Sequence, residues 1–167
     1  MATPTPEHVD DVVIRPVTAD DAEAVGQLWE RLVQYHHRLD PRLPTASANG
    51  GRLYARRVRE RVDDTHMRVF VAEHEGQIIG FVLGMIVDLV PEMFQARTGG
   101  FLADIYVLDA HRGAGVGRGL ADALADWFRS RGVSHMEWYV AHANRNGRAF
   151  WDKYGGDDVM IRMQQEL

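Results

Sequence analysis

The sequence predicts a mixed α/β domain, with a β-sheet covered by helices on both faces. Three observations support this prediction. Strand-like and helical segments follow one another in the order β-α-α-β-β-β-α-β-α-β. Two of the strand segments flank a Glu75-Gly76 turn, which is typical of an antiparallel hairpin. A later strand segment leads through a glycine-dense turn directly into a helical pattern.

Size and composition indicate one soluble globular domain. The chain has 167 residues, of which 46% are hydrophobic and 26% are charged. We expect a flexible tail at 1–11 and a single domain at 12–167. The absence of cysteine excludes a disulfide scaffold, a thiolate nucleophile and a cysteine-based metal site.

Charge and hydropathy also limit the partners. No apolar run approaches the roughly 18 residues of a membrane span, so we expect no membrane partner. The N-terminus lacks the basic and apolar regions of a signal peptide, which favours the cytoplasm. A net charge of −5 argues against non-specific binding of nucleic acid.

The first elements are a short strand at 12–15 and a long helix. Thr18 followed by Asp21 is typical of a helix start, as a capping box with Asp in place of Glu. The helical periodicity ends near Asp40-Pro41. The apolar residues at helical spacing are Ala22, Val25, Leu28, Trp29, Leu32 and Val33.

A second helix is expected at 52–62, after a loop at 43–51. Arginines stand at positions 52, 56, 57, 59 and 61. We interpret them as part of a solvated helix face, since Glu60, Asp63 and Asp64 balance their charge. The alternative is a surface that attracts an acidic partner or the phosphates of a nucleotide.

The remaining elements are predicted in the same way. The hairpin strands are 67–73 and 77–87, and a loop at 91–100 is either a substrate lid or only a long connection. Further elements are expected at 102–107 (strand), 116–131 (helix), 136–140 (strand) and 146–154 (helix). Alternating apolar residues predict a half-buried last strand at 159–165.

The glycine-dense turn has the properties of an anion site. Glycines at 113, 115, 117 and 119 allow close approach of a ligand to the backbone. The helix that follows offers unpaired N–H groups and a positive dipole end. The spacing fits neither a Walker A loop nor a dinucleotide-binding fingerprint, because Arg118 and Leu120 occupy required positions.

The spacing that does fit is Arg112-Gly113-Ala114-Gly115-Val116-Gly117, preceded by Ile-Tyr-Val. A second motif runs from Asn144 through Phe150-Trp151 and Lys153 to Gly155. Together they resemble the GNAT superfamily of N-acetyltransferases, in the family's order and at about its separation. The resemblance implies a splayed, mostly antiparallel sheet, acetyl-CoA as cosubstrate and a homodimer.

The resemblance also implies which residues bind acetyl-CoA. Backbone groups of Ile105 and Val107 would pair with the pantetheine arm, and an N–H near Val107 would bind the thioester. Amides of the loop would hold the diphosphate; its residues are Arg112, Gly113, Ala114, Gly115, Val116, Gly117 and Arg118. Asn144 and Trp151 complete the expected cofactor contacts, and the alternative role of Asn144 is to cap the short helix.

The resemblance implies a tyrosine as the general acid, but Trp151 occupies the position of that tyrosine. An indole N–H does not titrate. Tyr154 lies one helical turn further and is the candidate acid, with core packing as its alternative role. Asp104 is the candidate base, or else an ion-pair partner or substrate anchor. Tyr106 and Tyr139 are further candidate acids.

We expect no metal site. His36 and His37 are adjacent and point to different sides of a helix, so a substrate-side or surface role is preferred. The predicted reaction is acetyl transfer to a primary amine of a small molecule, such as a polyamine, amino acid or aminoglycoside, in a ternary complex. The alternatives are acetylation of a protein amine and a catalytically weak acyl-CoA-binding module.

Overall fold

The sheet contains the strands in sequential order. A computed structural model describes residues 11–88 and 92–167, and within these residues the sheet has five strands, ordered β1-β2-β3-β4-β5. Neighbouring strands are antiparallel, except that β5 pairs with β4 in parallel. The strands are β1 (Val12–Pro16), β2 (Met67–His74), β3 (Gln77–Asp88), β4 (Thr98–Val107) and β5 (Met136–Trp138).

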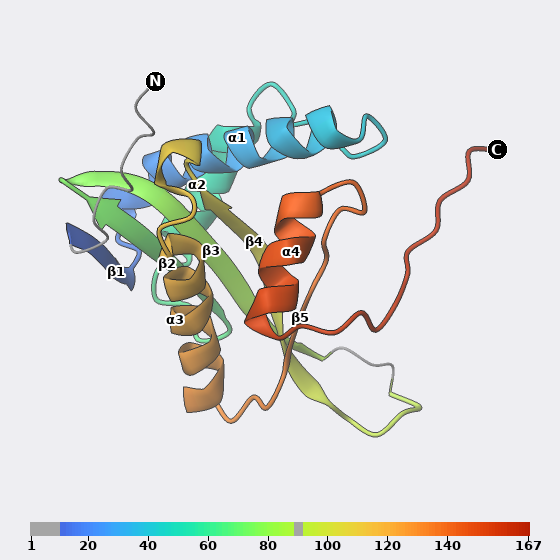
Figure 1. Cartoon of the computed structure of the whole chain (residues 1–167). Helices are drawn as coiled ribbons and strands as arrows, with labels where there is room; N and C mark the ends of the chain where they lie inside the picture. Colours follow the sequence, from blue (N-terminus) through green and yellow to red (C-terminus); the bar gives the residue numbers. More distant parts are fainter. Residues whose placement is uncertain (1–10, 89–91) are drawn as a thin grey trace.

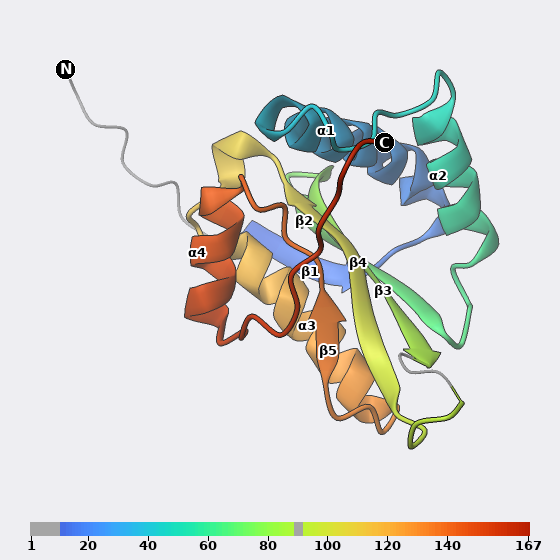
Figure 2. The ribbon, with the colours of Figure 1, turned by 90° about the vertical axis from the view of Figure 1, so that its right-hand side faces the viewer.

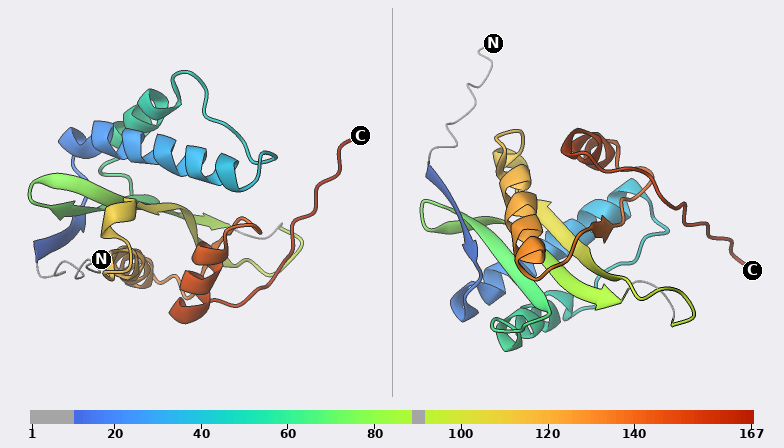
Figure 3. Two further views of the ribbon diagram at one scale, coloured as in Figure 1. Left: turned by 45° about the horizontal axis from the view of Figure 1, so that its top comes forward. Right: turned by 90° about the horizontal axis from the view of Figure 1, so that it is seen from below.

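Helices cover both faces of this sheet. Figure 1 and the left view of Figure 3 show α1 and α2 on one face and α3 and α4 on the other. This arrangement confirms the predicted fold class. The helices are α1 (Ala22–Leu39), α2 (Gly50–Glu60), α3 (Val116–Ser130) and α4 (Arg145–Tyr154), with short 3-10 turns at Ala19–Asp21 and Asp109–His111.

An apolar cluster forms on each face of the sheet, and the helical periodicity explains which residues enter it. One cluster includes Val25, Leu28 and Leu32 of α1, together with Val58 and Phe81. The other includes Leu120, Leu124 and Phe128 of α3, together with Ile79, Val82 and Leu102. Burial of these side chains provides the main driving force that holds the helices on the sheet.

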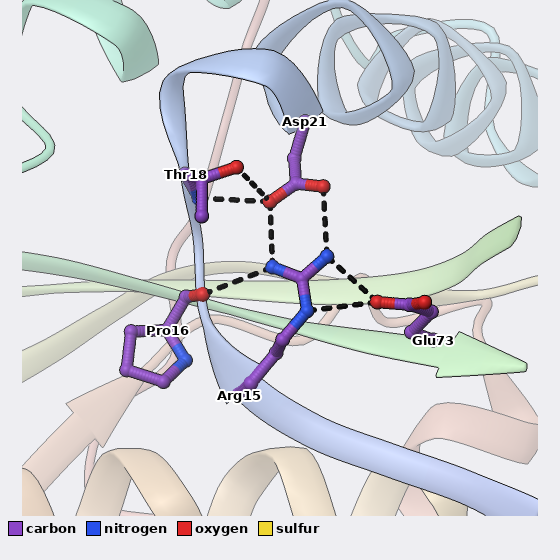
Figure 4. Close-up of polar contacts among 5 residues, drawn as sticks. All are labelled: Arg15, Pro16, Thr18, Asp21 and Glu73. Carbon is purple, nitrogen blue, oxygen red and sulfur yellow. Dashed lines mark hydrogen bonds and ion pairs between the residues drawn. The ribbon is translucent and has the colours of Figure 1, made fainter. Parts of the chain in front are cut away.

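A charged network fixes the start of α1 against the sheet (Figure 4). Both guanidinium NH groups of Arg15 donate to the Asp21 carboxylate, at 2.7 and 2.9 Å, and its Nε donates to Glu73 at 2.8 Å. The Thr18 N–H and hydroxyl each donate to Asp21 at 2.8 Å. The predicted capping residues are therefore joined to β1 and β2. Hydrogen bonding to Arg15 is the main reason that the pKa of Asp21 falls to about 2.

Several boundaries differ from the prediction. α2 begins at Gly50, two residues early, where the N–H of Gly51 donates to Glu30 of α1 at 3.0 Å. β4 begins at Thr98, so the end of the predicted 91–100 loop is strand, while Pro91 lies outside the described residues. The predicted flexible tail lies outside them as well, apart from Asp11.

The predicted strand at 159–165 is wrong, since this segment has no regular structure. Val159 and Ile161 are 88% and 82% exposed, and Met160, on the opposite side of the alternation, is 89% exposed. Alternation produces a half-buried strand only where a neighbouring strand and a core cover one face. Within the described chain the sheet ends at β5, and Figure 1 shows the C-terminal segment extending away from it.

Candidate active site

The sheet opens between β4 and β5. Their parallel pairing covers only Gly100 to Leu102 on β4, and Figure 2 shows β5 ending well before the end of β4. A bulge follows at once, because Gly84 pairs with Leu102 and Leu83 with Asp104, which leaves Ala103 unpaired with β3. A bulge bends a strand and increases its twist. The remainder of β4, at 103–107, therefore has an open edge within the described structure.

Ile105 and Val107 direct their backbone groups to this open edge. The N–H of Leu108 donates to the carbonyl of Ile79 at 2.9 Å, and Val107 lies opposite Gly80. Leu108 and Ile79 therefore form a hydrogen-bonded pair of the antiparallel ladder. The next pair, Val107 and Gly80, is then a non-hydrogen-bonded pair, in which the N–H and C=O groups face away from the partner strand. Val107 therefore points them outward, and Ile105, two residues earlier, does the same.

The glycine-dense turn forms an open cradle at the start of α3. Gly113 and Gly115 have φ values of +81° and +85°, which glycine adopts without strain. A Cβ atom added at either position would meet nothing within 4 Å. The first backbone bond of the helix runs from Gly119 N–H to Gly115 C=O at 3.0 Å. The N–H groups of Val116, Gly117 and Arg118 thus lack helical partners and, with the helix dipole, fit a diphosphate.

The side chains of Arg112 and Arg118 hold the loop in place. Arg112 donates from Nε to the carbonyl of Val107 at 2.9 Å and pairs with Asp109 at 2.8 Å. Its own N–H donates to the carbonyl of Asp109 at 3.2 Å, so the available loop amides begin after it. Arg118 donates to the carbonyl of Lys153 at 3.1 Å and thereby joins α3 to α4.

Asn144 caps α4 and contacts α1. Its Oδ1 accepts from the N–H of Gly147 at 2.9 Å and from the hydroxyl of Tyr35 at 3.2 Å. The Tyr35 ring lies 5.2 Å from the Arg112 guanidinium. The capping role considered for Asn144 is thus present. Tyr35 was not anticipated, since no local pattern shows that it meets a loop 109 positions away.

Asp104 lies on the α1–α2 face of β4. The hydroxyl of Tyr54 on α2 donates to its Oδ2 at 2.9 Å. Burial raises the pKa of Asp104, whereas the bond from Tyr54 and the charge of Arg57 oppose the rise. A carboxylate with a raised pKa is better suited to accept a proton near neutral pH.

A cavity of about 250 Å³ lies beside Asp104. Trp29, Val33 and His36 contribute one face of α1, at helical spacing. His36 thus lines the cavity, and burial lowers its pKa. His37 turns away and contacts the carbonyl of Leu43 at 3.0 Å. The full lining is Trp29, Val33, His36, Leu43, Pro44, Thr45 and Asp104.

Comparison with known families agrees with this geometry. The acetyltransferase (GNAT) family pattern matches residues 29–156, which is more than half of the chain. The chain belongs to the acetyltransferase (GNAT) family. The predicted family and enzyme class, an acetyl-CoA-dependent acyltransferase, are thereby confirmed, and acetyl-CoA is the cosubstrate of the family.

Individual similarities are more distant. A segment of 64 residues is 39% identical to a mycothiol acetyltransferase of Beutenbergia cavernae, and covers 36% of this chain but 22% of that protein. A variant of the BH1408 protein from Bacillus halodurans has a TM-score of 0.82 at 23% identity, over 93% of this chain and 99% of that one. Aminoglycoside N-acetyltransferase AAC(6')-Iy in complex with CoA has a TM-score of 0.72 at 20% identity, over 93% of this chain and 94% of that one.

In this GNAT protein the two proposed catalytic residues lie on different faces of the sheet. Tyr154 donates its hydroxyl to Asp122 of α3 at 2.9 Å, and burial together with this bond raises its pKa to about 12. Trp151 is buried, with its ring 4.4 Å from Trp138. The structure therefore does not bring Tyr154 to Asp104, and it places the Trp151 ring in the core beside β5.

Within residues 11–88 and 92–167, every helix is too short or too polar to cross a membrane. In the same part of the chain, no three acidic or histidine side chains converge as they would around a metal ion.

Proposed function

We propose that this protein transfers the acetyl group of acetyl-CoA directly to the primary amine of a small molecule, with both substrates bound together. One observation carries the proposal: Asp104, the open edge of β4 and the glycine loop follow one another within residues 104–118. The edge offers outward backbone groups for the pantetheine arm, and the loop offers N–H groups for the diphosphate. Asp104 faces the adjoining cavity.

The residues present fit the chemistry. Acetyl-CoA supplies a thioester carbonyl that a neutral amine can attack. The outward N–H of Val107 orients and polarises that carbonyl. Asp104 accepts the proton of the acceptor's ammonium group, directly or through water. The new N–C bond forms as the C–S bond breaks, and the nitrogen releases its second proton to solvent as it becomes the amide. The thiolate takes a proton from solvent, which is feasible because thiols ionise at about pH 8.5.

The test is release of free CoA, followed with DTNB, in the presence of acetyl-CoA and a panel of primary amines. We expect amine-dependent release that follows saturation kinetics.

A second candidate function is an acyl-CoA-binding module. It is favoured because Tyr154 lies away from the α1–α2 face and donates its hydroxyl to Asp122. Binding of acetyl-CoA without release across the whole panel would support that module. Acetylation of a protein amine would instead appear with peptide acceptors only.

The cradle is tested separately from the chemistry. Gly115→Asp places a carboxylate in the open cradle, where it repels a diphosphate. Acetyl-CoA binding, measured by calorimetry, should weaken at least 100-fold. Gly132→Asp is the matched control, since Gly132 has φ +76° and equal free space but follows the end of α3. Unchanged affinity in Gly115→Asp, or equal loss in both variants, would remove the loop from the binding site.

We also propose a cytoplasmic homodimer. Val159, Ile161 and Met163 are each more than 80% exposed and alternate along an extended segment. The same segment of a second copy offers a self-complementary partner, because antiparallel pairing is compatible with two-fold symmetry.

A further inference from the structure

We infer that the acceptor is a small amine with a single positive charge and a compact apolar body, whose ammonium group lies at Asp104 and whose body packs between Trp29 and the loop at 43–45. The inference rests on the proposed function and narrows its acceptor. It depends on the cavity beside Asp104, on the side chains that line it and on the charges around it.

Neighbouring side chains hold the Asp104 carboxylate in one position. Tyr54 donates to Oδ2 of Asp104 at 2.9 Å and thus fixes the carboxylate. The Tyr54 ring is held in turn by Trp29, stacked with centroids 5.0 Å apart, and by Phe81, edge-on at 6.0 Å. A fixed carboxylate beside an indole ring is a favourable site for one cationic nitrogen.

The rest of the cavity favours an apolar body. Four of its lining residues offer mainly apolar surface: Trp29, Val33, Leu43 and Pro44. The cavity volume, about 250 Å³, is below the roughly 300–1,000 Å³ of sites for drug-sized ligands. An acceptor of this site is therefore smaller than an aminoglycoside.

The charge around the cavity disfavours a second cation. Among the described residues of the lining, Asp104 is the one acidic residue, and the charge of Arg57 acts on both Asp104 and Tyr54. Two nearby acidic residues already have partners within the chain. The Glu30 carboxylate on α1 accepts a hydrogen bond from the N–H of Gly51, and Asp40, after α1, forms an ion pair with Arg42 at 2.7 Å. A polyamine would therefore find no second carboxylate for its further ammonium groups within the described lining.

The test compares kcat/KM for four acceptors at saturating acetyl-CoA: 2-phenylethylamine, 3-methylbutylamine, spermidine and kanamycin. We expect the two monoamines to exceed both polycations by at least tenfold. A preference for spermidine or kanamycin would overturn the inference and leave the proposed function intact. No CoA release with any acceptor, despite acetyl-CoA binding, would overturn the proposed function itself.

Variants of Trp29 test the position of the apolar body. Trp29→Ala should lower kcat/KM for 2-phenylethylamine 10- to 100-fold, chiefly through KM, while the affinity for acetyl-CoA stays within twofold. Trp29→Phe keeps a flat ring against Tyr54 and should retain most of the activity. Equal KM values in Trp29→Ala and the unmodified protein would place the acceptor elsewhere. Unchanged acetyl-CoA affinity shows that a loss in Trp29→Ala does not reflect misfolding.

Discussion

Burial and the hydrogen bond from Tyr54 act in opposite directions on the pKa of Asp104, the proposed base. Burial favours the neutral carboxyl and raises the pKa of Asp104, and the Tyr54 hydroxyl limits that rise by hydrogen bonding to the charged form. The sequence predicted that Asp104 lies on the strand before the glycine loop. Its hydrogen-bond partner, Tyr54, lies 50 positions earlier on α2. Only the packing of α2 on the sheet brings the two together.

Tyr54→Phe should therefore raise the pKa of Asp104. A base works only when deprotonated, so activity falls as the pH drops through its pKa, and a higher pKa moves this acidic limb to higher pH. We expect the acidic limb of the kcat/KM profile to shift to higher pH. Tyr139→Phe is the control, because Tyr139 is 79% exposed. An unchanged limb in Tyr54→Phe would show that Asp104 is not the group that titrates.

Asp104→Asn should remove the acidic limb itself. The amide keeps the size of the side chain but cannot accept a proton, so kcat/KM at pH 7.5 should fall about 100-fold or more. The measurement is the same pH profile, taken with the best monoamine. A small loss that is uniform with pH would assign Asp104 to positioning of the acceptor.

Among the elements, the start of α1 is joined to two strands by a network of polar contacts. Arg15 of β1 contacts both Asp21 at the helix start and Glu73 of β2 (Figure 4). The sequence indicated the capping pair Thr18–Asp21, because that signal is local. It did not indicate Arg15 as the common partner, since the contact with Glu73 spans 58 positions.

Asp21→Asn should destabilise the fold by about 2–3 kcal/mol at pH 7, since the loss of one partner leaves Arg15 partly buried and incompletely paired. The pKa of Asp21 falls from its ordinary 3.8 to about 2 on folding, so its contribution is full above pH 4 and is lost as the pH falls toward 2. Urea unfolding at pH 7 and pH 2.5 should show a smaller difference at the lower pH. Asp20→Asn, at an exposed neighbour, should change stability by less than about 0.5 kcal/mol.

At the scale of the whole molecule, local sequence patterns predicted the fold and the glycine loop better than they predicted the residues around the cavity beside Asp104. α1 and α3 were predicted because their apolar stripes are long and regular, and the glycine loop because its spacing is itself the signal. The strand at 159–165 failed because its alternation does not show whether a partner strand exists. Trp29, Tyr35 and Tyr54 could not be assigned, since each acts through a residue far away in the sequence.

Removal of residues 157–167 tests the proposed dimer. These residues are exposed, so the shortened chain should keep its far-UV circular dichroism and a Tm within a few degrees when measured at low concentration. Light scattering should show that the full chain is dimeric and the shortened chain monomeric. A full chain that is monomeric at 100 μM, or a shortened chain that stays dimeric, would contradict the proposal.

The placement of Asp104 and the glycine loop has a kinetic consequence. The cavity beside Asp104 is lined from α1 and the loop after it, whereas the proposed diphosphate cradle lies at the start of α3, a helix on the other face of the sheet. The lining of the cavity and the glycine loop have no residue in common. Acetyl-CoA and the amine should therefore be able to bind in either order, and the kinetics should be those of random-order addition.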